Sequence, residues 1–423
     1  MNRRVVITGM GVVAPNGHGL DTFEKALREG RSGVHFHPRL KELKFGCQIG
    51  GVIEDFDAIR KSYFDHEKLL SINDNIGYAS VAAVDAWHDA GFEIDEDGQA
   101  HWDTGAIIGC GIGGMDTIAE KVVPGINEGK VRRLGSRIVE QVMNSGPSAR
   151  VGGLLGLGGQ VTSNSSACST ATEALVEAFR KIRFGFAERM LAGGSEGASP
   201  YIWGGFDAMR VIARKYNDEP EKGSRPMSAT ANGFVPGAGG AVLILEELET
   251  ALKRGARIYA EVLGGSVNSG GQRNGGSMTA PNPEGVQRCI REALANAGIR
   301  PEEIDAINGH LTATFADPYE IKNWATALGR GPSDFPFVNS TKSMVGHCLG
   351  AAGAIESVAV ALQLYKGFLH PSINCEDIHP EIEDYGDKIP QKVMEYPELK
   401  IIAKASFGFG DVNSCLIFKK WDE

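Results

Sequence analysis

Short apolar runs alternate along the chain with longer stretches in which apolar residues return every three or four positions. The runs predict buried strands, and the longer stretches predict helices with one buried face. The predicted strands cover residues 4–8, 104–108, 160–163, 189–193, 240–245, 259–263, 304–307, 401–405 and 413–418. The predicted helices cover residues 21–27, 76–90, 284–297 and 355–364, another helix begins near residue 168, and residues 31–70 look irregular. Strands that alternate with helices indicate an α/β fold with largely buried sheets.

The pattern restarts near Arg257. A strand, a polar loop, a helix and another strand follow from there, and this order of elements is similar to that of the first part of the chain. No short sequence motif is clearly repeated in both parts, so the evidence for internal duplication is this order of elements alone. We predict two similar halves, residues 1–255 and 256–423.

Composition excludes several classes of protein. A net charge of −10 over 423 residues argues against a nucleic-acid-binding protein, which is normally basic. Seven scattered cysteines without a Cys-x-x-Cys pair indicate reduced thiols rather than disulfides or a zinc site. No apolar run approaches the roughly 20 residues of a membrane span, and the run after Arg3 is too short and too broken by glycine for a signal peptide. We therefore expect a cytoplasmic protein with no membrane and no nucleic-acid partner.

Cys168 lies in a stretch, residues 164–179, that follows a β-prone run and takes on helical spacing. Ala171, Leu175 and Phe179 recur on one helix face, so Cys168 is expected at a strand-to-helix turn. At a helix N-terminus, free backbone N–H groups and the helix dipole stabilise a thiolate. A buried, inert thiol is the alternative, and for a cysteine taken alone it is the favoured one.

Two histidines at predicted element junctions reverse that preference. His310 follows a strand, and His347 follows Lys342 and precedes a helix that opens with small residues. A histidine near a helix N-terminus has a lowered pKa and acts as a neutral hydrogen-bond donor. The order of Cys168, His310, Lys342 and His347, each at a junction, favours a nucleophilic active site.

Other motifs suggest different chemistry. Residues 109–114 match the dinucleotide fingerprint, and residues 9–14 match its looser form. Pro15 interrupts the helix after residues 9–14, and the acid downstream of residues 109–114 lies in a loop. Residues 193–197 match the Gly-x-Ser-x-Gly hydrolase elbow, but Pro200 stands where the helix should begin. His35 and His37 are a possible pair of metal ligands without a third ligand nearby. We favour none of these interpretations.

Several longer motifs make the chain resemble the β-ketoacyl-acyl-carrier-protein synthases, especially the elongating type II enzymes, over almost its full length. They are residues 4–9, 167–169, 224–226, 233–235, 308–310, 340–347, 350–354 and 406–410. Two histidines, in place of a histidine and an asparagine, separate this group from the chain-initiating synthases. The resemblance implies the thiolase fold, with two similar βαβ halves in a layered α-β-α-β-α arrangement, usually as a homodimer.

The implied reaction is a decarboxylative Claisen condensation in fatty-acid or polyene/polyketide elongation. Cys168 would take an acyl chain from acyl carrier protein, and malonyl-carrier protein would then lose carbon dioxide and attack the thioester. The backbone N–H groups of Cys168 and Phe409 would form the oxyanion hole, and His310 and His347 would stabilise the enolate. No metal or other cofactor is required.

The resemblance also implies supporting roles. Lys342 would orient the histidines, with Glu356 as its partner. A gate between the acyl and malonyl sites would contain Phe407, Gly408, Phe409 and Gly410. Ile112 and Ile138 fall where the family lines its acyl pocket. Basic residues that could dock the acidic carrier protein are Lys130, Arg132, Arg133, Arg210, Arg214 and Lys215.

The sequence departs from the family pattern at three places. Leu311 replaces a glycine and is expected to add bulk beside His310. Asp411 is expected either to stiffen the gate or to change its contacts, and residues 227–232 replace a charged segment. These changes suggest a specialised carrier protein or product. One alternative is a subunit of a heterodimer with a chain-length factor; a non-catalytic subunit of that kind would not need Cys168. Another is a thiolase-type degradative enzyme, which the histidine and lysine set disfavours.

Overall fold

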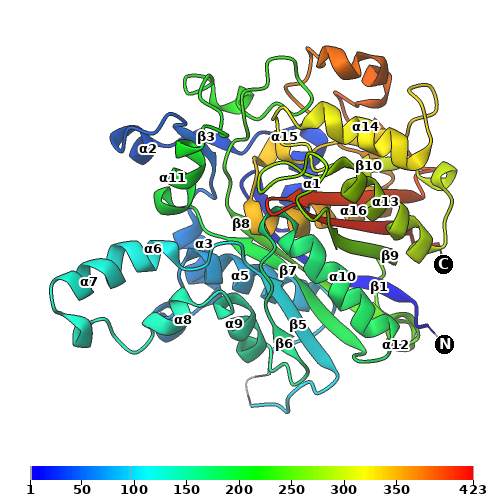
Figure 1. Ribbon diagram of the computed structural model, residues 1–423. Coiled ribbons are helices and arrows are strands. Elements are labelled where there is room, and N and C mark those ends of the chain that lie inside the picture. The colour runs from blue at the N-terminus through cyan, green and yellow to red at the C-terminus, as the bar shows by residue number, and fades with distance from the viewer. Residues whose placement is uncertain (1, 96, 423) are drawn as a thin grey trace.

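The computed structural model describes residues 2–95 and 97–422 (Figure 1). Eleven strands among these residues form one sheet. They are β1 (Val5–Ala14), β2 (Gly17–His18), β5 (Thr104–Gly109), β6 (Val161–Thr162), β7 (Arg189–Glu196), β8 (Gly239–Glu247), β9 (Ala260–Ser269), β10 (Ala306–Asn308), β11 (Phe337–Asn339), β14 (Ile401–Gly408) and β15 (Val412–Lys420).

The sheet consists of two parts with the same strand order. One part runs β6-β5-β7-β8-β1 and the other runs β11-β10-β14-β15-β9. In each part the first three strands of this order are parallel, and the last two pair antiparallel. The parts join where residues 5–7 of β1 pair with residues 260–262 of β9. The proposed boundary between two duplicated halves, residues 1–255 and 256–423, remains a prediction from the sequence.

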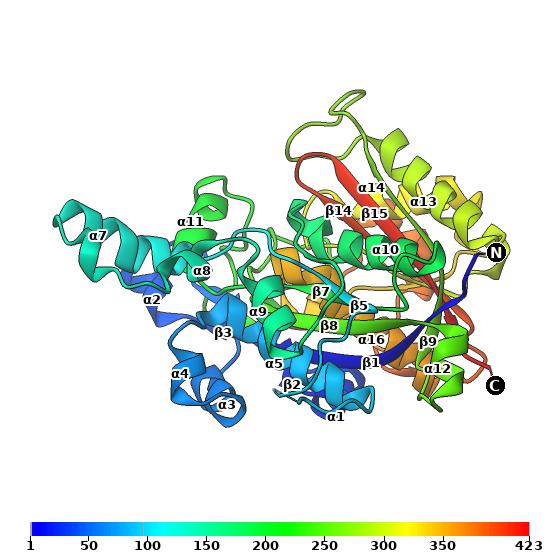
Figure 2. The same cartoon turned by 90° about the horizontal axis from the view of Figure 1, so that it is seen from below.

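Helices lie between the two parts of the sheet and on their outer faces. Helices α10 (Thr170–Arg183) and α16 (Ala352–Lys366) contact strands of both parts and each other, so they form the central layer. The outer faces are covered by α5 (Asp74–Asp89) and α9 (Gly146–Leu154) on one side and by α13 (Pro283–Ala297), which packs against α14 (Asp317–Leu328), on the other. Figures 1 and 2 show α10 and α16 at the centre of the molecule. The predicted α-β-α-β-α arrangement of the thiolase fold is confirmed.

The central position of α10 and α16 follows from their residues. Ala171, Leu175 and Phe179 are almost completely buried, as the helical spacing predicts. Helix α16 is buried on nearly all sides, and its small residues permit close approach: a Cβ added at Gly353 would lie 2.2 Å from the Thr172 hydroxyl of α10. The close packing of α10 on α16 can therefore bring residues from both parts of the sheet close together.

Several short elements were not predicted. Residues 31–70, expected to be irregular, contain β3 (Val34–Phe36), α2 (Pro38–Glu42), β4 (Ile49–Gly51), α3 (Phe56–Tyr63) and α4 (His66–Leu69). Other elements that the pattern did not indicate are α6 (Met115–Thr117), α7 (Val123–Asn127), α8 (Ile138–Val142), α11 (Pro200–Ala208), α12 (Leu248–Lys253), α14, β11, α15 (Lys342–Val345), β12 (Phe368–Leu369) and β13 (Met394–Glu395). Most are too short to show a repeating apolar face. Helices α6, α7 and α8 extend to one end of the molecule, opposite the two chain termini (Figure 2).

Within the part of the chain that the structure describes, no helix is long and apolar enough to cross a lipid bilayer.

Candidate active site

Cys168 lies in a 3-10 turn, Ala167–Ser169, that leads directly into α10. Ala167 has a left-handed φ of 51°, which turns the chain sharply before the nucleophile. The Thr170 hydroxyl donates to the Ala167 carbonyl (2.7 Å) and accepts the Ser166 N–H (2.9 Å), so side-chain bonds hold the turn. The predicted strand-to-helix position of Cys168 therefore has a defined geometry at the start of the central helix.

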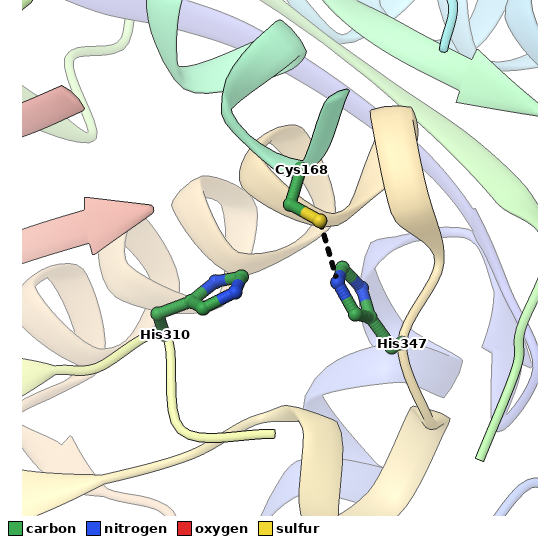
Figure 3. Close-up of side chains that lie close together, drawn as sticks. All are labelled: Cys168, His310 and His347. Carbon is green, nitrogen blue, oxygen red and sulfur yellow. Dashed lines mark hydrogen bonds between the residues drawn. The ribbon is translucent and has the colours of Figure 1, made fainter. Parts of the chain in front are cut away.

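His347 contacts the sulfur of Cys168. Its Nε2 lies 3.0 Å from Sγ (Figure 3). The Leu349 backbone N–H donates to Nδ1 (3.2 Å), so in the neutral ring Nδ1 is the acceptor and Nε2 carries the proton. His347 therefore presents an N–H donor to the sulfur.

His310 faces the same space from the other half of the molecule. Its ring centre lies 5.3 Å from that of His347, with the rings nearly perpendicular at 83° (Figure 3). Its backbone N–H donates to Glu320 Oε1 (2.6 Å), and the next N–H, of Leu311, donates to Oε2 (2.8 Å). The buried Nδ1 has no hydrogen-bond partner among the described residues. The backbone is thus fixed while the ring keeps free hydrogen-bonding capacity.

Burial and nearby positive charges hold both imidazoles neutral. Burial lowers the pKa of His310 and His347 well below its usual value, and the ammonium groups of Lys342 and Lys404 lower it further. Burial raises the pKa of the Cys168 thiol to about 11, opposed by Lys342 and by the N–H groups of Phe409 and Cys168. The position at the start of α10 also favours the thiolate. Two neutral donors therefore face a thiol that must lose its proton as it reacts.

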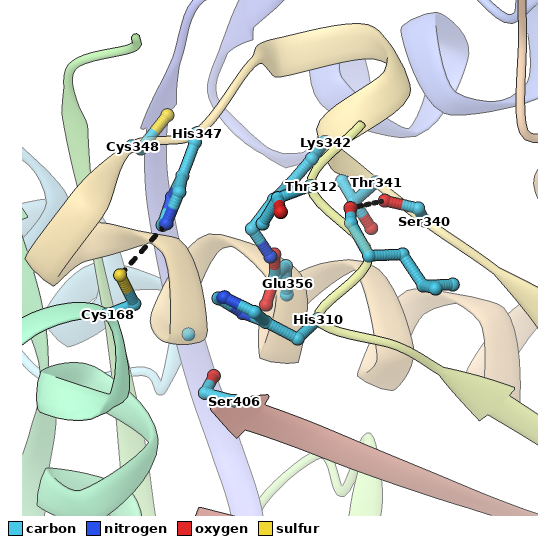
Figure 4. Close-up of polar contacts among 12 residues, drawn as sticks. Cys168, His310, Thr312, Ser340, Thr341, Lys342, His347, Cys348, Glu356 and Ser406 are labelled. Carbon is cyan, nitrogen blue, oxygen red and sulfur yellow. Dashed lines mark hydrogen bonds and ion pairs between the residues drawn. The ribbon is translucent and has the colours of Figure 1, made fainter. Parts of the chain in front are cut away.

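A buried ion network lies beside the histidines. Lys342, on α15, contacts Oε1 of Glu356, on α16, and both side chains are 1% exposed (Figure 4). Lys404, on β14, reaches the other carboxylate oxygen, with Nζ 2.9 Å from Oε2. Sequence reasoning missed Lys404. The signal was a charged residue inside the apolar run of residues 401–405, where a buried strand needs a counter-charge for a lysine.

The three reactive side chains open onto a cavity of about 680 Å³. Ile112, Phe206, Phe234 and Phe409 are among its apolar lining residues. Ile138 is not: it lies on α8, which packs against α6 and α9, so the single chain does not bring it to the cavity.

Leu311 also lies outside the cavity lining, so the expected bulk beside His310 is wrong. Its side chain is fully buried in the apolar core of the second half. The backbone at this position has a positive φ of 23°, and the Leu311 N–H remains bound to Glu320. The leucine thus fills the core behind the histidine instead of narrowing the site.

The segment Gly408 to Asp411 is bonded to a second loop. The Gly410 N–H donates to the Met278 carbonyl (2.8 Å), and the Asp411 carbonyl accepts the Gly270 N–H (2.9 Å). The Asp411 carboxylate accepts the N–H groups of Gln272 and Asn282, each at 2.8 Å. Asp411 therefore joins the gate to the loop of residues 270–282, which also lines the cavity.

Substitution of Asp411 by asparagine is expected to loosen both loops. Asparagine tolerates the left-handed φ of 61° but replaces one acceptor oxygen with an amide that faces a backbone N–H. We expect a loss of about 1–3 kcal/mol in the free energy of unfolding, together with faster hydrogen exchange at Gln272 and Asn282. The exposed Asp218→Asn change is the control. Unchanged exchange at the two amides would contradict this role.

The basic docking candidates occupy two separate places. Lys130, Arg132 and Arg133 are exposed beyond α7, at the projecting end of the molecule (Figure 2), and Lys130 pairs with Glu128 at 2.6 Å. Arg210 and Lys215 are exposed beyond α11, where the intervening Val211 lines the cavity. Arg214 is half-buried and paired with Asp207 at 3.3 Å. The structure therefore brings only the second group towards the cavity.

The competing motifs have structural explanations. The glycine turn after β5 binds a protein carboxylate, because Glu196 accepts the N–H groups of Gly111 and Ile112 (each 3.0 Å). Ser195 is fully buried and donates to Asn75 Oδ1 (2.6 Å). The metal-compatible cluster found among the described residues is Cys168, His310 and His347, whose donor atoms lie within 4.8 Å of one another. These contacts give neither the glycine turn nor Ser195 a catalytic role.

Comparisons with known proteins agree on one family. The family models for the N-terminal and C-terminal domains of beta-ketoacyl synthases match residues 2–251 and 259–376. The chloroplastic 3-oxoacyl-acyl-carrier-protein synthase I of Arabidopsis thaliana is 37% identical over 420 residues, covering 98% of this chain and 86% of that protein.

Solved structures give the same result. A beta-ketoacyl synthase from Burkholderia phymatum superposes with a TM-score of 0.91 at 30% identity, covering 99% of this chain and 100% of that one. The ishigamide ketosynthase/chain length factor superposes with a TM-score of 0.89 at 29% identity, covering 100% of both chains.

Proposed function

Because the chain belongs to the beta-ketoacyl synthase family, we propose that it joins an acyl group held on Cys168 to malonyl-carrier protein, in fatty-acid or polyene/polyketide elongation. The observation that carries this proposal is the contact of 3.0 Å between Cys168 Sγ and His347 Nε2, with a second neutral histidine beside it. A soft nucleophile and two neutral donors suit acyl transfer followed by enolate formation.

The first step is transfer of the acyl group to the enzyme. The Cys168 sulfur attacks the thioester carbon of acyl-carrier protein, the bond to the carrier's thiol sulfur breaks, and the carrier leaves as a thiol with the proton. The backbone N–H groups of Phe409 and Cys168, which lie against the sulfur, are the donors for the tetrahedral oxyanion. Apolar residues of the cavity hold the acyl chain away from water.

The second step forms the new carbon–carbon bond. The malonyl carboxylate leaves as carbon dioxide, and the electron pair of the broken bond passes to the thioester as an enolate. His310 and His347 donate hydrogen bonds to the enolate oxygen. The enolate carbon attacks the acyl thioester, and Cys168 leaves as a thiolate. The buried ion pair of Lys342 and Glu356 provides fixed charges beside the two histidines during this step.

Ile112 is proposed to limit the acyl chain. It lines the cavity, and Glu196 fixes its backbone N–H. Substitution by phenylalanine is expected to lower transfer from long acyl donors about 10-fold or more while short donors still react, because one or two methylenes that no longer fit have effects of this size. Acyl-enzyme formation against donor length is the measurement. Leu252→Phe, at an exposed position of α12, is the control. An unchanged length profile of the Ile112 variant would contradict the assignment.

We propose a homodimer formed through the projecting end of the molecule. The order of the sheet ends at β6, whose outer edge has no strand partner among the described residues. Helices α7 and α8 and the turn between them expose Val123, Ile126, Val131 and Val139 by 46–60%. An open strand edge and an exposed apolar surface are each typical of an interface. A heterodimer with a chain-length factor is the second candidate, favoured by the similarity to the ishigamide protein.

The partner proposed for the cavity mouth is acyl carrier protein, docked on Arg210 and Lys215. The exposed positive charge there would attract an acidic partner, although the whole chain is acidic. Lys130, Arg132 and Arg133 would contribute to docking only if, in a dimer, these residues of one subunit lay next to the cavity mouth of the other. We propose a cytoplasmic location, in keeping with seven free thiols.

The test is a condensation assay with acyl- and malonyl-carrier proteins, analysed for product by mass spectrometry. The expected products are carbon dioxide and a 3-oxoacyl-carrier protein two carbons longer than the donor chain. Decarboxylation without a longer product would argue for a non-condensing subunit. No reaction until a related subunit is added would favour the heterodimer.

A further inference from the structure

Lys404 is a second buried lysine on a carboxylate that already has one. Lys342 and Glu356 form a 1:1 pair in which both side chains are 1% exposed, and this pair alone is neutral. Lys404 is 0% exposed and adds its charge at 2.9 Å from the other carboxylate oxygen. Burial of an ion is costly unless it is compensated. A positive charge in excess of what neutrality requires therefore needs an explanation beyond folding.

The contacts of Lys404 suit an ammonium, and Glu356 favours that charged form, while burial lowers the pKa of Lys404. Its Nζ donates to Thr172 Oγ1 (2.7 Å), to the Ala405 carbonyl (3.2 Å) and to the Ser406 hydroxyl. Three acceptors match the three N–H donors of a charged lysine. The approach to Glu356 is an ion pair without hydrogen-bond geometry, and Oε2 has no hydrogen-bond partner among the described residues. The group of Lys342, Glu356 and Lys404 thus carries a net charge of +1.

This charge lies where the two halves of the site meet. Thr172 is on α10, one turn after Cys168, and Ser406 precedes the gate on β14; their hydroxyls are 2.8 Å apart. Ser169, the neighbour of Cys168, places its hydroxyl 3.1 Å from the Ser406 carbonyl. Lys404 therefore contacts α10 through Thr172, β14 through Ser406, and α16 through Glu356.

We propose that Lys404 is a positioning residue that completes a net positive group next to the His310 and His347 site, and so adds to burial in favouring the neutral, hydrogen-bond-donating form of both rings. This proposal rests on the proposed function. The titratable and charged groups around the histidines and Lys404 are Cys168 on the turn before α10, Glu320 on α14, Lys342 on α15, Cys348 after His347, Glu356 on α16 and Cys415 on β15. Lys342 is the cation among them, and Lys404 is the second cation of the site.

The direction of the effect on the pKa of each histidine follows from charge. A nearby cation disfavours a second cation, so Lys404 lowers the pKa of both rings. The neutral rings are the active forms. Activity is therefore lost only when the pH falls through the lowered pKa. Removal of the Lys404 charge raises that pKa and moves the loss of activity to higher pH.

The experiment is a pH titration of the histidine rings by NMR, in the full-length protein with isotope-labelled histidine. Lys404→Met removes the charge and leaves Glu356 paired with Lys342. Lys404→Gln keeps hydrogen-bonding groups near Thr172 and Ser406, should the methionine variant fail to fold. Both variants are expected to raise the midpoints of His310 and His347 by about one pH unit. Lys400→Met, an exposed lysine before the same strand, should leave both curves unchanged.

A second readout is the pH profile of carbon dioxide release from malonyl-carrier protein. The acid limb is expected to move up with the histidine midpoints, whereas a purely structural defect would lower the rate equally at every pH. Histidine curves of both Lys404 variants that superimpose on those of the unmodified protein would overturn the proposal. Failure of the unmodified protein to release carbon dioxide would instead overturn the proposed function, because the titration does not depend on activity.

Discussion

Substitution of Cys168 by alanine is expected to abolish condensation, with a fall of about 10⁴-fold or more. The sulfur is the atom that holds the acyl chain, and no described side chain near it offers another thiol on the cavity: Cys110 and Cys348 are buried outside its lining. Carbon dioxide release from malonyl-carrier protein should persist, because that step uses the histidines and not the sulfur. The measurement follows 3-oxoacyl product and carbon dioxide in the same reaction.

The control for this substitution is Cys289→Ala. Cys289 is a buried thiol on α13, in the core of the second half, and its Sγ contacts the Ser266 carbonyl. Its loss should affect stability but not the chemistry. If Cys168→Ala still formed the longer product at an appreciable rate, another residue would have to hold the acyl group.

Substitution of His347 by alanine is expected to slow both steps. The ring donates to the sulfur in the resting site, and the same Nε2–H is available to the enolate oxygen in the second step. Removal of one such donor lowers rates by about 100- to 1000-fold. Separate assays of acyl-enzyme formation and of carbon dioxide release should both show the loss.

His310→Ala provides the contrast. His310 has no hydrogen bond to the sulfur, so its loss should slow carbon dioxide release more than acyl transfer. His88, exposed on α5, is the surface control. Equal effects of the two active-site substitutions on both steps would contradict the separate roles that the geometry indicates.

The sequence predicted the reacting groups because each stands at a junction of elements. Cys168 and His347 precede the long helices α10 and α16, and His310 follows the short strand β10, which the apolar run of residues 304–307 predicted. The Lys342 and Glu356 pair came from resemblance, and the structure places the two side chains in contact.

Lys404 was missed because a lysine inside an apolar run does not by itself show which way its side chain points. A single lysine in a strand normally points to solvent, and only the packing of β14 against α16 and the turn before α10 places this side chain inside. The prediction about Leu311 was wrong for a similar reason, because the identity of a residue does not show on which side of the backbone its side chain lies. Ile138 was assigned by alignment alone, and the short helix α8 that carries it has no pattern that fixes its direction.

The most direct test of the account is the intact mass of the protein after incubation with acyl-carrier proteins of several chain lengths, followed by peptide mapping. The account predicts one acyl adduct, located on Cys168 and absent from Cys168→Ala. An adduct on another residue, or no adduct with any donor while the protein is folded and Cys168 is reduced, would contradict it.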